Sequence, residues 1–172
     1  MRAEMVFTGQ TGWLQGGRFG FILDATPNDF VSGELEGAVL ACDREAHPDV
    51  IFLEGQSALR NPSGPCGAEL LLSAGARAAV LQHAPARLEF EGLEGMGFPI
   101  PPVEDEIDLV RRYGALTLGV AWNTHGLPSE GREAARRSLE ATLGIPVVCP
   151  LEEGVGRLVA EVSRYVAREA SR

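Results

Sequence analysis

Five short apolar runs alternate with stretches of helical periodicity along the chain, and this alternation limits the possible folds more than any other feature. The expected strands are Met5 to Thr8, Val50 to Glu54, Ala78 to Gln82, Thr117 to Trp122 and Pro146 to Cys149. The expected helices are Asn28 to Arg44, Gly67 to Ser73, Val103 to Tyr113, Glu130 to Leu143 and Val155 to Glu169. Such alternation is typical of βαβ units. We therefore expect an α/β fold of three layers, with a mostly parallel sheet between flanking helices.

Length and composition indicate how many domains this fold forms. The chain has 172 residues, of which 45% are hydrophobic and 6% aromatic. These apolar residues are enough for one hydrophobic core and too few for two domains that each have a core of their own. We expect residues 1–172 to form a single domain.

The charged residues exclude several classes of function. The net charge is −9, and no concentrated basic face is visible in the sequence, so we expect no nucleic-acid partner. All 15 cationic side chains are arginines, and the sequence contains no lysine. A lysine that binds phosphate, forms a Schiff base or acts as a general base is therefore excluded for this chain.

The cysteines and the hydropathy pattern indicate the cellular compartment. Three widely separated cysteines, Cys42, Cys66 and Cys149, fit reduced thiols in a cytosolic protein better than a disulfide framework or a zinc site. No apolar run reaches the roughly 18 to 20 residues that a membrane span requires. We expect a cytoplasmic protein with no membrane partner.

Polar, glycine-rich loops follow four of the expected strands. Because the carboxyl ends of parallel strands form one edge of a sheet, where open α/β sheets bind ligands, we expect these loops to share a small-molecule site. Turns are polar and glycine-rich in any protein, which is the simpler interpretation. The four loops are Gly9-Gln10-Thr11-Gly12, Glu54-Gly55-Gln56-Ser57, His83-Ala84-Pro85 and Asn123-Thr124-His125-Gly126.

Glu54 gives the sharpest local signal, because it ends the apolar run Val50 to Leu53. P-loop enzymes use a carboxylate in this position to hold Mg²⁺ or a metal-bound water. Glu54 is accordingly a candidate metal ligand and a candidate catalytic base. The alternative is a solvent-exposed carboxylate at the end of the strand.

Two loops are candidate anion sites. The backbone amides of Gly9 to Gly12 could cradle an anion without a lysine, with Arg18 nearby to supply charge. A structural turn is the alternative. Residues 60–67, which include Arg60, form a turn-rich loop that opens a helix, and the helix N-terminus could also take an anion. A rigid crossover loop is the alternative there.

Other strand ends carry groups suited to polar contacts or proton transfer. Asn123 suits recognition of a purine edge or a substrate amide, although it is equally typical of a turn. His83 and His125 could act as general bases, because imidazole titrates near neutral pH. Each could equally be a solvated histidine. Cys66 lies near an expected helix N-terminus, where a thiolate is favoured, but no histidine partner is identifiable.

Taken in order, these motifs resemble the C-terminal domain of the family catalogued as domain of unknown function 1611, some members of which are described as D-glutamate N-acetyltransferases. The resemblance spans nearly the whole chain. It rests on Phe7 to Trp13, Leu23-Asp24, Pro27 to Glu36, Glu54-Gly55-Gln56, Asn61 to Gly64, Leu81 to Pro85 and Asn123. More distantly, the chain is similar to dethiobiotin synthetase, a P-loop enzyme in which a strand-ending Glu helps to bind Mg²⁺ and a later strand-ending Asn contacts the base. Glu54 and Asn123 match those positions.

The chain departs from this pattern at the phosphate-binding loop. P-loop folds carry GxxxxGK[ST] between the first strand and the first helix, and this sequence has neither that motif nor a lysine. We therefore expect a P-loop-like domain that is truncated at its N-terminus and belongs to a larger architecture. Without its central strand, such a domain should expose a sheet edge and apolar helix faces, so we expect a homo-oligomer.

The resemblance implies two alternative enzyme functions, and a non-enzymatic function stands beside them. The first is acetyl transfer from acetyl-CoA to an amino acid such as D-glutamate. In this scheme Glu54 or His83 acts as the base, Gln10, Thr11, Gln56 and Asn123 make polar contacts, and Arg18 and Arg60 clamp carboxylates. The second is a ligase or kinase-like activity that uses ATP with Mg, with Glu54 on the metal and Asn123 on adenine. The third is a non-catalytic domain for ligand binding or assembly.

Overall fold

The computed structural model describes residues 1–64 and 66–171, so Pro65, in the loop at 60–67, lies outside the described residues. The chain divides into two compact units, Met1–Ala76 and Arg77–Arg172, each of which is described by itself. The expectation of a single domain over 1–172 stays a prediction.

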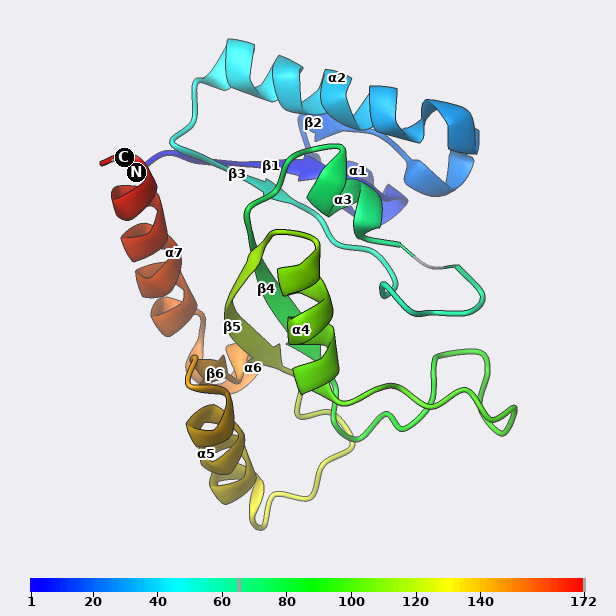
Figure 1. Cartoon of the computed structure of the whole chain (residues 1–172), viewed down its shortest axis with the longest axis vertical. Helices are drawn as coiled ribbons and strands as arrows, with labels where there is room; N and C mark the ends of the chain where they lie inside the picture. The colour runs from blue at the N-terminus through cyan, green and yellow to red at the C-terminus, as the bar shows by residue number, and fades with distance from the viewer. Residues whose placement is uncertain (65, 172) are drawn as a thin grey trace. The chain divides into compact units, whose positions relative to one another are not determined.

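Unit 1 is a small parallel sheet covered by a long helix (Figure 1). Its strand order is β2-β1-β3, with β1 parallel to both neighbours, and Ala3 pairs with Val50 and Val6 with Phe19. Val6 of β1, Phe19 of β2 and Cys42 of α2 form the buried core between the sheet and this helix. The elements are β1 (Ala3–Phe7), α1 (Gln10–Leu14), β2 (Phe19–Gly20), the 3-10 turn η1 (Leu23–Ala25), α2 (Asn28–Ala46), β3 (Val50–Leu53) and α3 (Ala68–Leu72).

Unit 2 is a second parallel sheet, with strand order β4-β5-β6. His83 pairs with Trp122 at the carboxyl ends of β4 and β5, and Val120 pairs with Val147. The elements are β4 (Ala78–His83), α4 (Val103–Arg112), β5 (Leu116–Trp122), α5 (Arg132–Leu143), β6 (Val147–Val148), α6 (Pro150–Glu153) and α7 (Gly156–Glu169).

Helices cover both faces of the unit 2 sheet. Val120 of β5 lies in the core cluster with Val103 of α4. The preceding residue, Gly119, faces Leu158 of α7, because a Cβ added at Gly119 would lie 2.6 Å from Leu158 Cδ2. Successive strand residues point to opposite faces, so α4 and α7 lie on opposite sides of β5. Unit 2 therefore has the expected three layers.

These observations confirm the α/β class and the mostly parallel sheets flanked by helices. All five expected strands and all five expected helices occur, with ends that move by at most two residues. The start of α5 is an example, since it begins at Arg132 after Gly131, whose φ of 75° needs glycine. The sequence analysis missed four short elements, namely α1, β2, η1 and α6.

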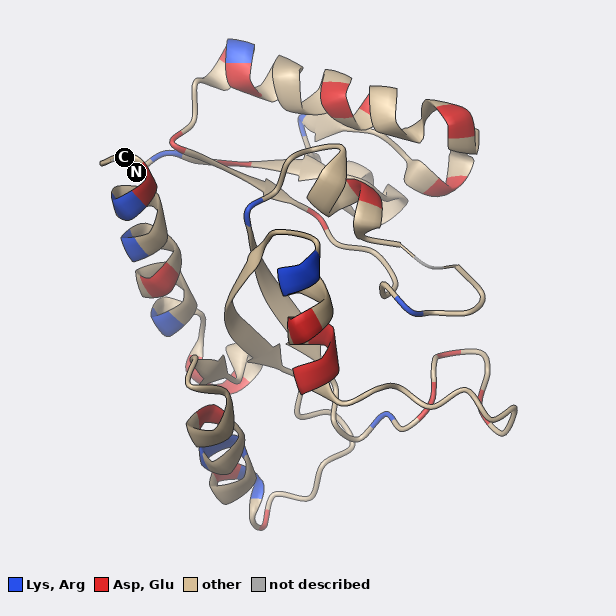
Figure 2. Cartoon of the chain, in the orientation of Figure 1, with Lys and Arg blue, Asp and Glu red and all other residues tan. Residues whose placement is uncertain are grey.

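Charged residues of both signs are interspersed along α5 and α7 (Figure 2). Among the described residues, no helix is long and apolar enough to cross a membrane.

Candidate functional site

The ends of β1 and β3 meet at one edge of the unit 1 sheet because the two strands are parallel neighbours. The pairing extends one residue beyond β3, where the Glu54 backbone N–H donates to the Val6 carbonyl at 2.9 Å. This places the loop that begins at Thr8 beside the loop that begins at Glu54. The adjacency of these two loops, expected from the sequence, is present in the structure.

The Glu54 carboxylate turns back onto the loop after β1. Its Oε2 accepts hydrogen bonds from the backbone N–H groups of Thr8, at 3.0 Å, and Gly9, at 3.2 Å. The Thr8 hydroxyl donates in return to the Glu54 carbonyl at 2.8 Å. Because Thr8 is fully buried, these bonds satisfy polar groups that water cannot reach. Glu54 therefore fixes the shape of the β1–α1 loop.

Gln56 completes this arrangement from the same loop as Glu54. Its side-chain amide donates to the Thr8 carbonyl and, at 3.2 Å, to the Thr8 hydroxyl. The N–H, the carbonyl and the hydroxyl of Thr8 are thus all bonded to Glu54 or Gln56. We call Thr8, Gly9, Glu54 and Gln56 the strand-end clasp of unit 1.

Two glycines leave room for the side chains of Glu54 and Gln56. A Cβ added at Gly12 would lie 2.8 Å from Glu54 Oε2 and 2.5 Å from the Cβ of Phe7. A Cβ added at Gly9 would lie 2.9 Å from the Gln56 side-chain nitrogen. Gly12 of the GxxG pattern is therefore required for close packing, whereas a methyl group at Gly9 would meet only the end of the Gln56 side chain at this distance.

The anion cradle expected at Gly9 to Gly12 is partly occupied by the protein itself. The amides of Thr8 and Gly9 donate to Glu54, while Gln10 and Thr11 are exposed on the first turn of α1. Only one Glu54 oxygen is used in this way, since Oε1 has no hydrogen-bond partner in residues 1–64 and 66–171. A metal or ligand role for Glu54 stays a prediction. Within those same ranges, no group of three or more His, Cys, Asp or Glu could hold a metal ion.

The two predicted arginines lie elsewhere in unit 1. Arg18 forms an ion pair with Glu45 of α2 at 2.8 Å, and its guanidinium stacks over the Phe19 ring at 4.6 Å. These contacts link β2 to α2, and a binding role for Arg18 stays a prediction. Arg60 is exposed in the loop between β3 and α3.

Cys66 precedes α3, as the sequence suggested, but its environment disfavours a thiolate. Burial raises the pKa of the Cys66 thiol, and the nearby Glu69 and Asp24 carboxylates raise it further. All three cysteines are free and buried, in agreement with the expectation of reduced thiols.

In unit 2 the strand ends bring His83 and Asn123 together. The Asn123 backbone N–H donates to the His83 carbonyl at 2.7 Å. Burial lowers the pKa of His83, and the charge of Glu104 opposes this effect only in part. His83 is therefore held as the neutral imidazole, the form that can accept a proton.

The Asn123 side chain makes a local turn that leaves a donor for other contacts. Its Oδ1 accepts a hydrogen bond from the His125 backbone N–H at 2.9 Å, as turn-forming asparagines do. The side-chain NH₂ makes no hydrogen bond within the described part of the chain. His125 itself is exposed.

A polar cluster next to Asn123 was missed by sequence reasoning. The buried Thr124 donates to Glu152 of α6, and Arg132 lies 3.6 Å from the same carboxylate oxygen. Arg132 also donates to the Leu127 carbonyl at 2.7 Å. The sequence indicated the Asn-Thr-His-Gly loop, but no local pattern links Thr124 to a residue 28 positions away.

These features define a class of protein, an α/β protein whose polar groups gather at the carboxyl ends of parallel strands. A family model described as "Domain of unknown function (DUF1611_C) P-loop domain" matches residues 1–159. The chain belongs to this family.

Two relatives and one solved structure support this assignment. The chain is 36% identical to a D-glutamate N-acetyltransferase of a Pseudoalteromonas species over 165 residues, which cover 90% of this chain and 47% of the relative. It is 34% identical to a D-glutamate N-acetyltransferase of Tritonibacter scottomollicae over 160 residues, which cover 88% of this chain and 46% of the relative. A crystal structure of a DUF1611 family protein from Anabaena variabilis matches with a TM-score of 0.81 and 27% identity, over 95% of this chain and 48% of that one. The chain thus spans about half the length of the relatives it matches.

Proposed function

We propose that this chain forms part of an enzyme that transfers an acetyl group from acetyl-CoA to the amino group of an acidic amino acid, D-glutamate. The observation that carries the proposal is the similarity to two D-glutamate N-acetyltransferases over about nine-tenths of the chain. The family match over residues 1–159 supports a role within the same domain.

The chemistry needs a group that accepts a proton from the amine. When the amine nitrogen attacks the acetyl carbonyl carbon, a C–N bond forms, the C–S bond breaks and the sulfur leaves as a thiolate. The proton released from the amine must pass to a base and can then neutralise the thiolate. We assign this role to His83, because burial favours its neutral imidazole and its backbone carbonyl accepts a hydrogen bond from the Asn123 N–H at the same strand end.

Glu54 receives a different role in the proposal. Its carboxylate is held by two backbone amides, so it acts as a positioning residue that fixes the β1–α1 loop. Gln10 and Thr11, which this loop exposes, are the proposed polar contacts to the substrate. Arg60 is the proposed contact to a substrate carboxylate, because an exposed guanidinium can bind a carboxylate in bidentate fashion.

The amides of Thr8 and Gly9 are not available to the phosphate groups of a nucleotide-containing donor. The sequence has no lysine, and the amides of Thr8 and Gly9 already donate to Glu54. We therefore assign no residue of this chain to those phosphates and derive no step through them.

The test is a direct assay of acetyl transfer. The chain is incubated with acetyl-CoA and D-glutamate, and both free thiol and N-acetylglutamate are measured, with L-glutamate as the stereochemical comparison. Because the chain spans about half of each relative, the assay is repeated with the Pseudoalteromonas relative in which the matching segment is replaced by this chain. Acetylation by either protein, lowered by His83→Gln, is the expected result.

Other results would overturn the proposal in distinct ways. Turnover only with Mg-ATP, abolished by a chelator, would replace acetyl transfer with the ligase or kinase-like function. If both proteins are folded by circular dichroism and neither turns over either donor, a binding or assembly domain becomes the better account. An active chimera that is insensitive to His83→Gln would remove His83 from the mechanism and keep the activity.

A further inference from the structure

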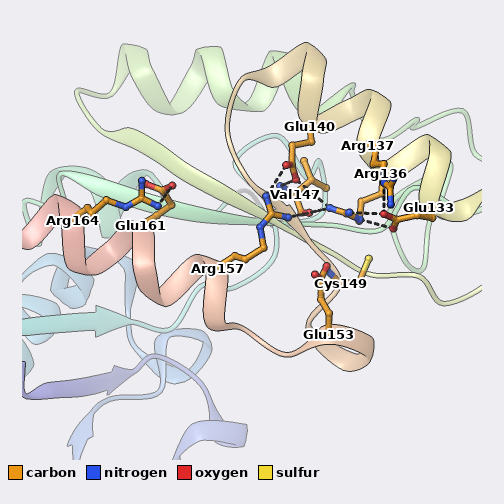
Figure 3. A network of polar contacts seen from close by, with 10 residues as sticks. All are labelled: Glu133, Arg136, Arg137, Glu140, Val147, Cys149, Glu153, Arg157, Glu161 and Arg164. Atoms are coloured by element: carbon orange, nitrogen blue, oxygen red, sulfur yellow. Dashed lines mark hydrogen bonds and ion pairs between the residues drawn. The ribbon is translucent and has the colours of Figure 1, made fainter.

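The outer edge of β6 is covered by charged side chains (Figure 3). β6 is an edge strand, because the unit 2 sheet has the order β4-β5-β6. The Pro146 carbonyl accepts a hydrogen bond from Val120 of β5, and Val148 pairs with Ala121. Along a strand of a parallel sheet, the backbone N–H and C=O groups of successive residues point to opposite sides. Because Pro146 and Val148 face β5, Val147 and Cys149 direct their backbone groups away from it.

Each backbone group that Val147 directs outward has a side-chain partner. The Val147 N–H donates to Glu140 Oε2 at 3.0 Å. The Val147 carbonyl accepts hydrogen bonds from Arg136 at 2.7 Å and from Arg157 at 3.4 Å. The next outward donor, the Cys149 N–H, donates to Glu153 Oε1 at 2.8 Å. Helices α5, α6 and α7 all contribute to this cover.

The side chains that cover the edge are held in place by one another. Arg136 binds both oxygens of Glu133, at 2.8 and 2.7 Å, and also reaches Glu140 at 3.1 Å. Arg157 donates to the other Glu140 oxygen at 2.6 Å. Only 11% of the Arg136 side chain is exposed, although its partner Glu133 is 56% exposed. Hydrogen bonds from Arg136 and Arg137 hold the pKa of Glu133 at about 2, so this carboxylate stays ionised near neutral pH.

Exposed strand edges are templates for pairing with another strand, whereas charged groups close them. The side chains that bond to Val147 and Cys149 therefore protect the outer edge of β6.

We propose that the network of Glu133, Arg136, Glu140, Glu153 and Arg157 closes the β6 edge to strand pairing with a second copy of this chain. An added strand would need the Val147 N–H, the Val147 carbonyl and the Cys149 N–H, and all three are already bonded. Sheet-mediated self-association of unit 2 is thereby directed away from β6.

The test compares two double variants that leave the net charge unchanged. Arg136→Ala with Glu140→Ala removes the central ion pair and two bonds to Val147. Glu161→Ala with Arg164→Ala is the matched control, because this α7 pair has the same chemistry, at 2.7 Å, and does not bond to β6. Self-association is measured by sedimentation equilibrium, and hydrogen exchange of the 146–149 segment is followed at low and high protein concentration.

The edge variant is expected to reach half-association at a concentration at least about tenfold lower than the control and the unmodified chain. Its amides at 147 and 149 should gain protection as the concentration rises, which distinguishes strand pairing from other aggregation. Equal association of the two folded double variants would overturn the proposal, as would association that leaves those amides unprotected.

A milder variant keeps the test decisive if the edge variant does not fold. Glu153 is exposed, and Glu153→Ala frees only the Cys149 N–H. We expect a smaller increase in association and concentration-dependent protection of the 149 amide. A folded Glu153→Ala chain that associates like the control and shows no such protection would count against the proposal.

Discussion

At the scale of single residues, Glu54 of the strand-end clasp lies where the sequence predicts, but its carboxylate binds backbone amides of the neighbouring loop. The sequence placed a carboxylate at the end of a buried strand and a GxxG loop after another. The carboxylate and the loop are present, but β3 itself is only partly buried. A carboxylate in that position is compatible with a metal ligand or with a cap for neighbouring amides. Only the fold shows that Glu54 bonds to the amides of Thr8 and Gly9.

Gly12→Ala tests the packing around this carboxylate. The added methyl would lie 2.5 Å from Phe7 Cβ and 2.8 Å from Glu54 Oε2, so the loop must shift. We expect a loss of about 1–3 kcal/mol in the free energy of unfolding, measured by urea titration. Gly33→Ala in α2 is the matched control, because a Cβ there meets nothing within 4 Å. That variant should be neutral or more stable by about 0.5–1 kcal/mol. A similar change for both variants would contradict the packing argument.

Glu54→Gln tests the hydrogen bonds of the clasp. The amide oxygen of glutamine can still accept a hydrogen bond, but the charge that strengthens both bonds is lost. We expect a loss of about 1–2 kcal/mol in the free energy of unfolding, because bonds to charged groups contribute more than neutral ones. Glu36→Gln, at an exposed position of α2, provides the control for the charge change. Equal stability of the two variants would show that the Glu54 charge contributes nothing to the clasp.

His83 should make stability depend on pH in a defined direction. Burial lowers its pKa in the folded state below the ordinary value of about 6.5. Between those two values the unfolded chain binds more protons, so stability rises with pH across this window. The contribution of neutral His83 is fully present above about pH 6.5 and is lost as the pH falls toward the folded value. The unmodified chain should lose stability relative to His83→Gln over that range, as measured by urea titration at a series of pH values. A constant difference would contradict the assignment.

At the scale of elements, the contact between β5 and α7 depends on one glycine. A methyl group added at Gly119 would lie 2.6 Å from Leu158 Cδ2 and 3.1 Å from the Pro146 carbonyl oxygen. We expect Gly119→Ala to lower the free energy of unfolding by about 1–3 kcal/mol, because the Leu158 side chain must leave its present position or α7 must shift.

A second substitution shows whether the helix contact is the cause. Leu158→Val shortens the side chain that meets the added methyl group, so the double variant should lose less stability than the sum of the two single changes. Strict additivity in a double-mutant cycle would show that Gly119 is required for another reason, such as the approach of Pro146.

The elements also show what the sequence could and could not predict. Periodicity located the long elements well, because α2 and β5 each present a continuous pattern of apolar residues. It missed β2 and α6, which contain two and four residues and are too short to show a period. The sequence also could not predict the charged side chains that cover β6. They come from α5, α6 and α7, and no local spacing specifies the hydrogen bonds that they form.

At the scale of the whole molecule, the open question is the number of cooperative units. The sequence predicts one domain, and the structure describes two compact units with 76 and 96 residues. Each unit has a three-stranded sheet and a small core. Units of this size bury a smaller fraction of their surface than one domain of 172 residues, so independent stability would be marginal.

We therefore expect one thermal transition, and the glycine variants can test this expectation. Gly12→Ala changes unit 1, whereas Gly119→Ala changes unit 2. If the chain unfolds as one cooperative domain, calorimetry should show a single peak whose midpoint falls in both variants, with equal calorimetric and van't Hoff enthalpies. If the units unfold separately, each substitution should shift only the transition of its own unit. Hydrogen exchange of the β1 and β5 peptides would then report two different free energies of opening, and the one-domain prediction would be wrong.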